Sequence, residues 1–307
     1  MKFNFFLKQQ RSSPIFHLSG GIGNQLFGYA AGKAYSRANN KSVRFDLSDI
    51  GKGFTNHGSS IEVLSLDLEI AANKSSFQKF QIRVFNKCDR IVYRYTGKKL
   101  PSLFNYNSHE IGFDEALLDK KYKSHFRGYF QSWRYVETVF DVFPPSEEIL
   151  NQPSEWFQDM SSLAIHVKPI IIHVRRGDYK KLANTYGLLS KEYYSAALSL
   201  TREYLPTNPI WIISDDLDDA RKILQSILPS DSNWISPPVG TDPVESLVLM
   251  SFGAANIIGN STFSWWGAML NRHSKITVAP EKWFKGMEDP KHLYPLGWRL
   301  VSSSWEN

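Results

Sequence analysis

Two adjacent arginines, Arg175 and Arg176, follow the apolar run 169–174 and precede Gly177 and Asp178. Guanidinium groups stay charged at physiological pH and bind phosphate oxygens as a planar fork. When a nucleoside diphosphate leaves a sugar, negative charge grows on the β-phosphate, and a fixed guanidinium there stabilises the transition state. Gly177 would let the turn approach a ligand, and Asp178 would orient an arginine or a hydroxyl. The alternative is a structural Arg–Asp pair that closes the loop after a strand.

A second polar cluster consists of Asn260, Ser261, Thr262 and Phe263, between an apolar run and a segment with helical periodicity. Ser261 and Thr262 are expected at the start of the helix, where backbone N–H groups and the helix dipole favour a diphosphate. The alternative is ordinary capping of the helix, with the neighbouring aromatic residues in the core.

An acidic cluster runs from Ser214 through Asp215, Asp216, Asp218 and Asp219. Asp216 and Asp218 have the spacing that holds a divalent metal under a sugar nucleotide in one class of transferases. Carboxylates in the first turn of a helix also cap it and interact favourably with its dipole. We expect capping from Asp218 and Asp219, and contact with a nucleoside from Ser214 and Asp215. No histidine or cysteine constellation supports a catalytic metal.

A glycine-rich loop contains Gly21, Gly23, Asn24 and Gln25, between a short apolar run and a helical stretch. Such a loop lets a ligand approach the backbone and the helix N-terminus. Asp46, expected at the end of the next strand, could imitate the acid that binds a cofactor ribose. The glycine spacing departs from the dinucleotide-binding fingerprint, because the third glycine comes too late. A nicotinamide or flavin site and a purely structural tight turn remain alternatives.

The elements that would position these clusters alternate between strand and helix. Strands are expected at 14–18, 43–45, 128–133, 169–174, 210–213, 255–258 and 276–278. Helices are expected from the glycine loop to 39–40 and at 147–165, 190–204, 218–228, 243–252 and 261–270. This alternation predicts an α/β fold with parallel sheets, and a doubly wound domain between about 165 and 300. The polar clusters then lie beyond the carboxyl ends of strands, where such sheets bind ligands.

The composition excludes several classes of protein. A chain of 307 residues with 42% hydrophobic and 21% charged residues is typical of two globular domains. The net charge of +6 favours acidic partners, but no long basic run predicts nucleic-acid binding. The single cysteine, Cys88, excludes an intrachain disulfide and a cysteine-rich zinc site. The apolar stretch Phe3–Leu7 is too short for a membrane span or a secretory signal, so a soluble or peripheral protein is expected.

Several strings, in this order along the chain, resemble the bacterial α-1,2-fucosyltransferases of glycosyltransferase family 11. The strings are GGIGNQLF at 20–27, GYFQS at 128–132, HVRRGDY at 173–179, SDD at 214–216, NSTFSWWG at 260–267 and PEKWF at 280–284. The arginine string and the string that begins at Asn260 are specific, whereas the glycine loop alone would not be. The resemblance implies a GT-B type fold, with two Rossmann-like domains facing a cleft. It implies an acceptor-side domain at 1–160 and a domain that binds GDP-fucose at 161–307.

The resemblance also implies roles for single residues. Arg175 matches the arginine expected on the donor β-phosphate, and Asp178 is the candidate general base by proximity alone. The donor-binding residues would be His173, Arg175, Arg176, Ser214, Asp215, Asn260, Ser261, Thr262 and Phe263. Gly21, Gly23, Asn24 and Gln25 would face the cleft from the acceptor side.

The implied reaction is a one-step inverting transfer of L-fucose from GDP-β-L-fucose to a galactoside hydroxyl, in α-1,2 linkage. Neither a metal nor another cofactor is expected. The acceptor would be an oligosaccharide or a lipid-linked glycan ending in galactose, in surface glycan synthesis of the O-antigen type. The expected location is cytoplasmic and peripheral to the inner face of the cytoplasmic membrane. Two alternatives remain: a dinucleotide-dependent oxidoreductase that uses the unit 20–46, and a non-catalytic carbohydrate-binding protein with its nine tryptophans.

Overall fold

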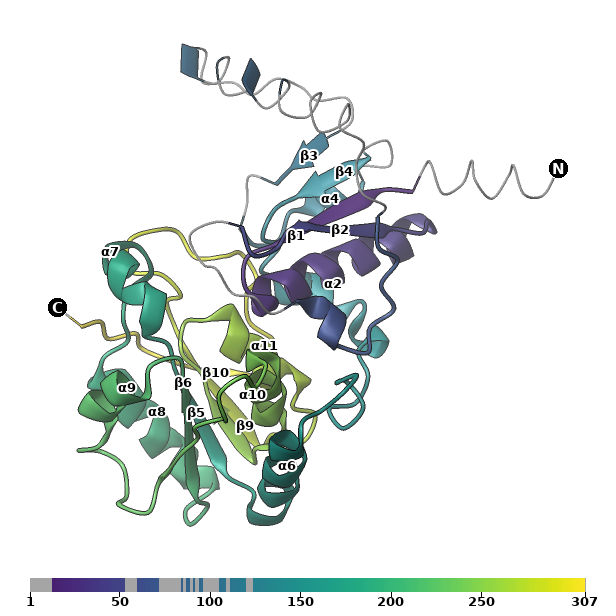
Figure 1. Ribbon diagram of the computed structural model, residues 1–307. Coiled ribbons are helices and arrows are strands. Elements are labelled where there is room, and N and C mark those ends of the chain that lie inside the picture. Colours follow the sequence, from purple (N-terminus) through teal and green to yellow (C-terminus); the bar gives the residue numbers. More distant parts are fainter. Residues whose placement is uncertain are drawn as a thin grey trace.

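The computed structural model describes residues 13–52, 60–71, 84, 87–88, 91, 94–95, 105–108, 111–119 and 124–306. In these residues two parallel β-sheets follow one another along the chain, each packed against helices (Figure 1). The predicted α/β fold with two Rossmann-like units is confirmed. The stretch Phe3–Leu7 and much of the segment 50–125 lie outside the described residues. No helix among those described is long and apolar enough to cross a membrane.

The first sheet has four strands in the order β2-β1-β4-β3. Their bounds are β1 Ile15–Ser19, β2 Arg44–Asp49, β3 Asn105–Asn107 and β4 His125–Arg127. Phe16 and Phe126 stack at 4.6 Å on the face that packs against helix α2, Ile22–Asn39. The shorter elements of this half are α4 Glu115–Leu118, α5 Trp133–Glu137, η1 Ile61–Val63 and η2 Phe140–Val142. Because strand order reverses beside β1, a crevice is expected between the carboxyl ends of β1 and β4.

The second sheet has six strands in the order β10-β9-β8-β5-β6-β7. Their bounds are β5 Ile170–Val174, β6 Ile210–Ser214, β7 Asn233–Trp234, β8 Ala255–Ile257, β9 Ile276–Pro280 and β10 Arg299–Val301. Read from β7, this is the 3-2-1-4-5-6 order of Rossmann sheets. The point where strand order reverses lies between β5 and β8, so a ligand is expected beyond the carboxyl ends of these two strands.

Helices cover both faces of the second sheet. One face packs against α8 (Lys191–Tyr204) and α9 (Leu217–Leu224), through a core that includes Ile170, Ile172 and Val174. The other face packs against α6 (Glu155–Val167), α10 (Pro243–Leu249) and α11 (Thr262–Leu270). The remaining elements are α7 Ala183–Tyr186, η3 Gly177–Leu182 and η4 Met250–Phe252. Strand residues alternate between the two cores, as a fully buried parallel strand requires.

The structure corrects three predicted elements. The helix expected at 147–165 begins only at Glu155, because residues 149–151 pair with residues 63–65 as an extended segment. The strand expected at 128–133 is a turn followed by α5, since β4 ends at Arg127. Asp46 lies within β2 rather than at its end, since that strand continues to Asp49.

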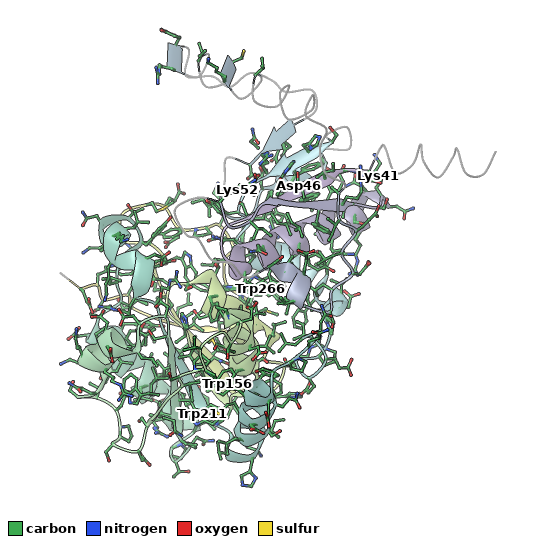
Figure 2. All side chains as sticks on the ribbon, viewed as in Figure 1. Lys41, Asp46, Lys52, Trp156, Trp211 and Trp266 are labelled. Carbon is green, nitrogen blue, oxygen red and sulfur yellow. The ribbon has the colours of Figure 1, made fainter. Side chains whose placement is uncertain are left out.

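Aromatic side chains from both halves share one core at their junction. Phe27 of α2 contacts Trp265 and Trp266 of α11, with ring centroids 4.5 and 5.3 Å apart. Trp266 lies at the boundary between the two halves in Figure 2. The predicted domain boundary at residue 160 falls inside α6, a helix that packs on α10 of the second half.

The chain returns to the first half near its C-terminus. The carbonyl of His292 accepts hydrogen bonds from the Trp133 N–H at 2.9 Å and from the Ser132 hydroxyl at 2.8 Å. The carbonyl of Lys291 accepts one from the Phe113 N–H at 3.1 Å. We call residues 290–293 the returning segment. It joins the two halves by backbone hydrogen bonds as well as by packing.

Candidate functional site

Arg175 follows directly after β5, at the carboxyl edge of the second sheet. Its guanidinium lies between two carboxylates, with Nη2 2.5 Å from Asp178 Oδ1 and Nη1 3.1 Å from Asp215 Oδ2. The guanidinium also lies over the ring of Tyr179, 5.2 Å from its centroid. The side chain is 12% exposed. Arg175 is therefore held in a fixed orientation, as the stabilisation of a leaving phosphate requires.

Arg176 has a different environment from its neighbour. Its Nε lies 2.7 Å from Asp219 Oδ2 and its Nη2 2.6 Å from Glu306 Oε2, and its side chain is 5% exposed. The chain turns after β5, and Arg176 is the N-cap of the short helix η3, so the two adjacent side chains reach different partners. Arg176 ties the sheet edge to α9 and to the C-terminal segment through these two carboxylates, and its contact with the donor stays a prediction.

Asp215 joins the two arginines. One carboxylate oxygen accepts from the Arg176 backbone N–H at 2.8 Å, and the other faces Arg175. A Cβ on Gly177 would lie 2.4 Å from Asp215 Oδ2, so only glycine leaves room for this carboxylate. The Ser214 hydroxyl accepts from the Asp216 N–H at 3.1 Å. Both residues predicted near a nucleoside thus shape the loop around Arg175.

Asp216 is the residue that caps α9. Its Oδ1 accepts from the Asp219 N–H at 3.0 Å, which corrects the capping role predicted for Asp218 and Asp219. Its Oδ2 lies 2.8 Å from Lys180 Nζ, and this hydrogen bond lowers the pKa of Asp216. Among the described residues, no group of three or more histidine, cysteine or acidic side chains could hold a metal ion.

The loop after β8 lies beside the backbone of Arg175. A Cβ on Gly259 would be 3.6 Å from the Arg175 nitrogen. The Asn260 side chain donates to the carbonyls of Tyr186, Gly187 and Trp283, so this predicted donor residue is a buried scaffold. The structure therefore brings the arginine cluster and this loop together at the reversal point of the second sheet.

Ser261 is the N-cap of α11, and its hydroxyl makes no capping hydrogen bond. Phe263 stacks on His173, with ring centroids 5.3 Å apart. Burial and the charge of Arg175 lower the pKa of His173 to about 3, so this imidazole is neutral at physiological pH. His173 and Phe263 therefore pack against each other, and Ser261 and Thr262 form the start of α11.

The start of α2 meets the start of α11. A Cβ on Gly23 would lie 2.4 Å from the backbone carbonyl carbon and oxygen of Thr262. Only a glycine allows the two helices to approach this closely. The carboxyl edges of the two sheets are thereby brought to one place, and two helix N-termini point into it.

The predicted residues of the glycine loop have different environments. Gln25 is fully buried; its amide donates to the Gly20 carbonyl at 3.0 Å and accepts from the Ile61 N–H at 2.9 Å. It braces the loop from the core, and its predicted place on the acceptor side of a cleft stays a prediction. Asn24 is partly exposed, and its Oδ1 accepts from Gln131 Nε2 at 2.9 Å. Gly21 is the N-cap of α2 and stands at the same junction.

Asp46 does not occupy the position that a dinucleotide site requires. Its Oδ2 lies 3.1 Å from His17 Nδ1, and its Oδ1 accepts from the Ser48 N–H at 2.9 Å. His17 Nε2 is in turn 3.1 Å from His125 Nδ1. These side chains form a ladder across the middle of the first sheet, so the basis for the oxidoreductase alternative is lost.

Three residues absent from the predicted site lie at the same junction. Tyr129 and Gln131 stand in the turn after β4, and Tyr186 belongs to α7. Tyr179 and Tyr186 stack at 4.9 Å, and burial together with nearby Tyr129 and Asp178 raises the pKa of Tyr186. Tyr129 is 48% exposed. The string GYFQS was the available signal for Tyr129 and Gln131, whereas nothing in the sequence marks Tyr186.

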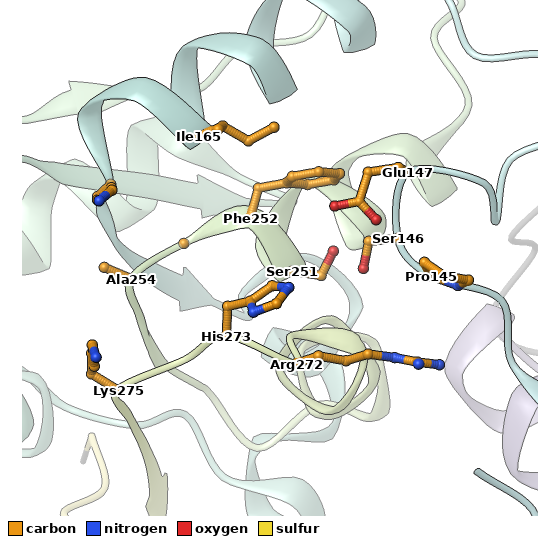
Figure 3. Close-up of a pocket in the computed structure, with 12 residues that line it drawn as sticks. Pro145, Ser146, Glu147, Ile165, Ser251, Phe252, Ala254, Arg272, His273 and Lys275 are labelled. Atoms are coloured by element: carbon orange, nitrogen blue, oxygen red, sulfur yellow. The ribbon is translucent and has the colours of Figure 1, made fainter. Parts of the chain in front are cut away.

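A cavity of about 520 Å³ lies elsewhere, at the amino ends of the second sheet's strands. Ile165 and Phe252 line one side of it and His273 and Arg272 the other (Figure 3). It contains none of the predicted site residues. Lys168 and Arg272 lie at or just beyond the ends of α6 and α11, where cations compensate the negative end of the helix dipole. Lys275 directly precedes β9.

The chain resembles known proteins in sequence and in fold. The sequence model described as "Glycosyl transferase family 11" matches residues 113–299. The chain is 29% identical over 289 residues to an "Alpha-1,2-colitosyltransferase" of Escherichia coli, covering 90% of this chain and 94% of that protein. It is 26% identical over 329 aligned positions to the "O-antigen biosynthesis glycosyltransferase WbnK" of Escherichia coli, covering 94% and 98%. The solved fucosyltransferase NodZ from Bradyrhizobium aligns with 83% of this chain and 91% of its own, at 12% identity and a TM-score of 0.43.

Proposed function

The chain belongs to glycosyltransferase family 11, and we propose that it transfers L-fucose from GDP-β-L-fucose to a galactoside hydroxyl in α-1,2 linkage. The acceptor would be an oligosaccharide or a lipid-linked glycan, in surface glycan synthesis of the O-antigen type. The names of the two Escherichia coli relatives support the linkage and the pathway class. We propose that the reaction needs no metal and takes place at the inner face of the cytoplasmic membrane.

One observation carries the proposal: Arg175 is fixed at the reversal point of a Rossmann-type sheet, beside the loop that begins α11. A diphosphate at this point would meet a guanidinium and the N–H groups of a helix start. These groups stabilise charge that is greater on the leaving diphosphate than on the intact donor. They therefore favour the departure of a nucleoside diphosphate over simple sugar binding, and this disfavours a non-catalytic carbohydrate-binding protein.

In an inverting transfer the acceptor oxygen attacks the anomeric carbon as the bond to the diphosphate breaks. The β-linked donor then gives an α-linked product, and the acceptor proton passes to a base or to the departing phosphate. Asp178 is held 2.5 Å from Arg175, and a carboxylate paired with a guanidinium is a weak base. We assign Asp178 the orientation of Arg175 and expect little base assistance from it.

The name of the colitosyltransferase suggests a second candidate donor, GDP-colitose. Colitose is fucose without its 3-hydroxyl, so a family member at 29% identity could use either sugar. The two donors share the diphosphate chemistry described above. They differ only in a hydroxyl that would be bound on the side of the first sheet.

The proposal is tested by thermal-shift binding of GDP, GDP-fucose, GDP-colitose, UDP and NAD, each with and without EDTA. A ligand that binds only the folded state raises the melting temperature. We expect stabilisation by GDP and a GDP-sugar that persists in EDTA, followed by acceptor-dependent release of GDP. Stabilisation by UDP or NAD alone would overturn the donor assignment, and loss of the shift in EDTA would overturn metal independence.

A further inference from the structure

Gln131 has a buried polar atom that the fold leaves without a partner. The residue is 6% exposed, and its Nε2 donates to Asn24 Oδ1 at 2.9 Å. Its Oε1 is buried and has no hydrogen-bond partner among the residues that the structure describes. A buried acceptor without a donor costs free energy, so such an atom needs an explanation.

The backbone around Gln131 is held in an unfavourable conformation. Phe130, directly before it, has φ of 53°, a value that a bulky L-residue rarely adopts. Its ring is buried, 6.1 Å from each of the rings of Phe16 and Tyr135. The Gln131 N–H donates to the Ile111 carbonyl at 2.7 Å, and Ser132 then caps α5. Strain that packing maintains in this way is typical of functional sites.

The position of Gln131 follows from three contacts described above. It bonds to Asn24, and the adjacent Gly23 touches the backbone of Thr262 at the start of α11. Gln131 also lies beyond β4, at the reversal point between β1 and β4, where the first sheet is expected to bind ligands. It is therefore next to the place proposed for the diphosphate, on the side of the first sheet.

We infer that Gln131 Oε1 accepts a hydrogen bond from a hydroxyl of the sugar that is transferred. This inference rests on the proposed function. The group that follows a diphosphate in a sugar nucleotide is a pyranose, and its hydroxyls are donors of the kind that an orphaned amide oxygen requires. Asn24 positions the amide by occupying Nε2, which leaves Oε1 for the ligand. A site built around such an acceptor discriminates strongly against a sugar that lacks the matching hydroxyl.

The test compares Gln131→Leu with Gln131→Glu, and with Gln158→Leu as a matched control on the exposed surface of α6. The affinities of GDP and of the GDP-sugar are measured separately, with KM for donor and for acceptor. In Gln131→Leu we expect the affinity for the GDP-sugar to fall roughly tenfold to a hundredfold and that for GDP to stay within about twofold. Gln131→Glu keeps an acceptor oxygen and should recover part of the loss, since Asn24 can present its amide to the carboxylate. Gln158→Leu should change nothing.

Three results would overturn the inference. Equal losses of GDP and GDP-sugar affinity would mean a general disturbance of the junction. A change confined to the KM for acceptor would assign the hydroxyl to the acceptor instead. Unchanged sugar-nucleotide affinity in Gln131→Leu would leave the residue without a role in binding. Failure of the proposed function is distinguished from these results, because the unaltered protein would then bind neither GDP nor a GDP-sugar.

Discussion

The carboxyl edges of the two sheets meet at one junction but present different chemistry to it. The edge of the second sheet carries Arg175 between the carboxylates of Asp178 and Asp215. The edge of the first sheet carries the neutral amides of Asn24 and Gln131, which bond to each other. The first edge also carries one ion pair, between Arg127 at the end of β4 and Asp49 at the end of β2. Under the proposed function the guanidinium of Arg175 would face the leaving diphosphate, and the two amides would face the sugar. Under the proposed function, leaving-group stabilisation and sugar recognition would therefore belong to separate halves of the molecule.

The largest effect is expected from removing the guanidinium of Arg175 at the edge of the second sheet. Arg175→Ala should lower kcat by about a hundredfold to a thousandfold, as the loss of one group that stabilises transition-state charge does. The KM for acceptor should change little, because we propose that the acceptor binds on the side of the first sheet. Initial rates at saturating donor measure both quantities, with Arg299→Ala on the exposed β10 as control. An unchanged kcat would exclude Arg175 from the leaving-group role.

A smaller effect is expected from a substitution that pushes the starts of α2 and α11 apart. Gly23→Ala places a methyl group 2.4 Å from the Thr262 backbone, and relief of such a clash costs about 1–3 kcal/mol. We expect a lower melting temperature and roughly tenfold slower transfer, with GDP affinity retained, because the second sheet would bind the nucleotide alone. Gly297→Ala, which meets nothing within 4 Å, is the matched control. Loss of GDP affinity in Gly23→Ala would show that both edges hold the nucleotide.

The smallest effect is expected at Asp178. Asp178→Asn keeps a hydrogen-bond acceptor for Arg175, and Asp215 still pairs with the guanidinium. If Asp178 only orients Arg175, kcat should fall by less than about tenfold, whereas loss of a general base costs about a hundredfold or more. Rates are compared with those of Asp159→Asn, an exposed change on α6. A fall of several hundredfold would make Asp178 the base.

The sequence predicts the second half better than the first, for physical reasons. Its strands are continuous apolar runs bounded by polar turns, so their ends are visible, as at β5 and β6. The start of α6 is missed because residues 149–151 pair with residues 63–65, more than eighty positions earlier. Pairing over such a distance leaves no local pattern in the sequence. The turn at Phe130 is missed because a positive φ at phenylalanine depends on tertiary packing alone.

The candidate site shows the same limit. The sequence indicates that the pair Arg175 and Arg176 lies at a strand end, and the structure places it there. Which arginine faces the site depends on Glu306, a partner 130 positions away in the chain. The orientation of the Gln131 amide depends on Asn24, which is 107 positions away in the chain. Residue types suggest the chemistry, but long-range partners decide which residue performs it.

The returning segment has a consequence for how the protein is made. The N–H groups of Phe113 and Trp133 find their acceptors only in Lys291 and His292. A ribosome therefore has to synthesise the chain at least as far as residue 292 before the first half can complete its hydrogen bonding. Domains generally fold in the order of their synthesis, yet here the earlier half has to wait for the last few dozen residues. Premature termination near the C-terminus would consequently damage the half of the protein that was translated first.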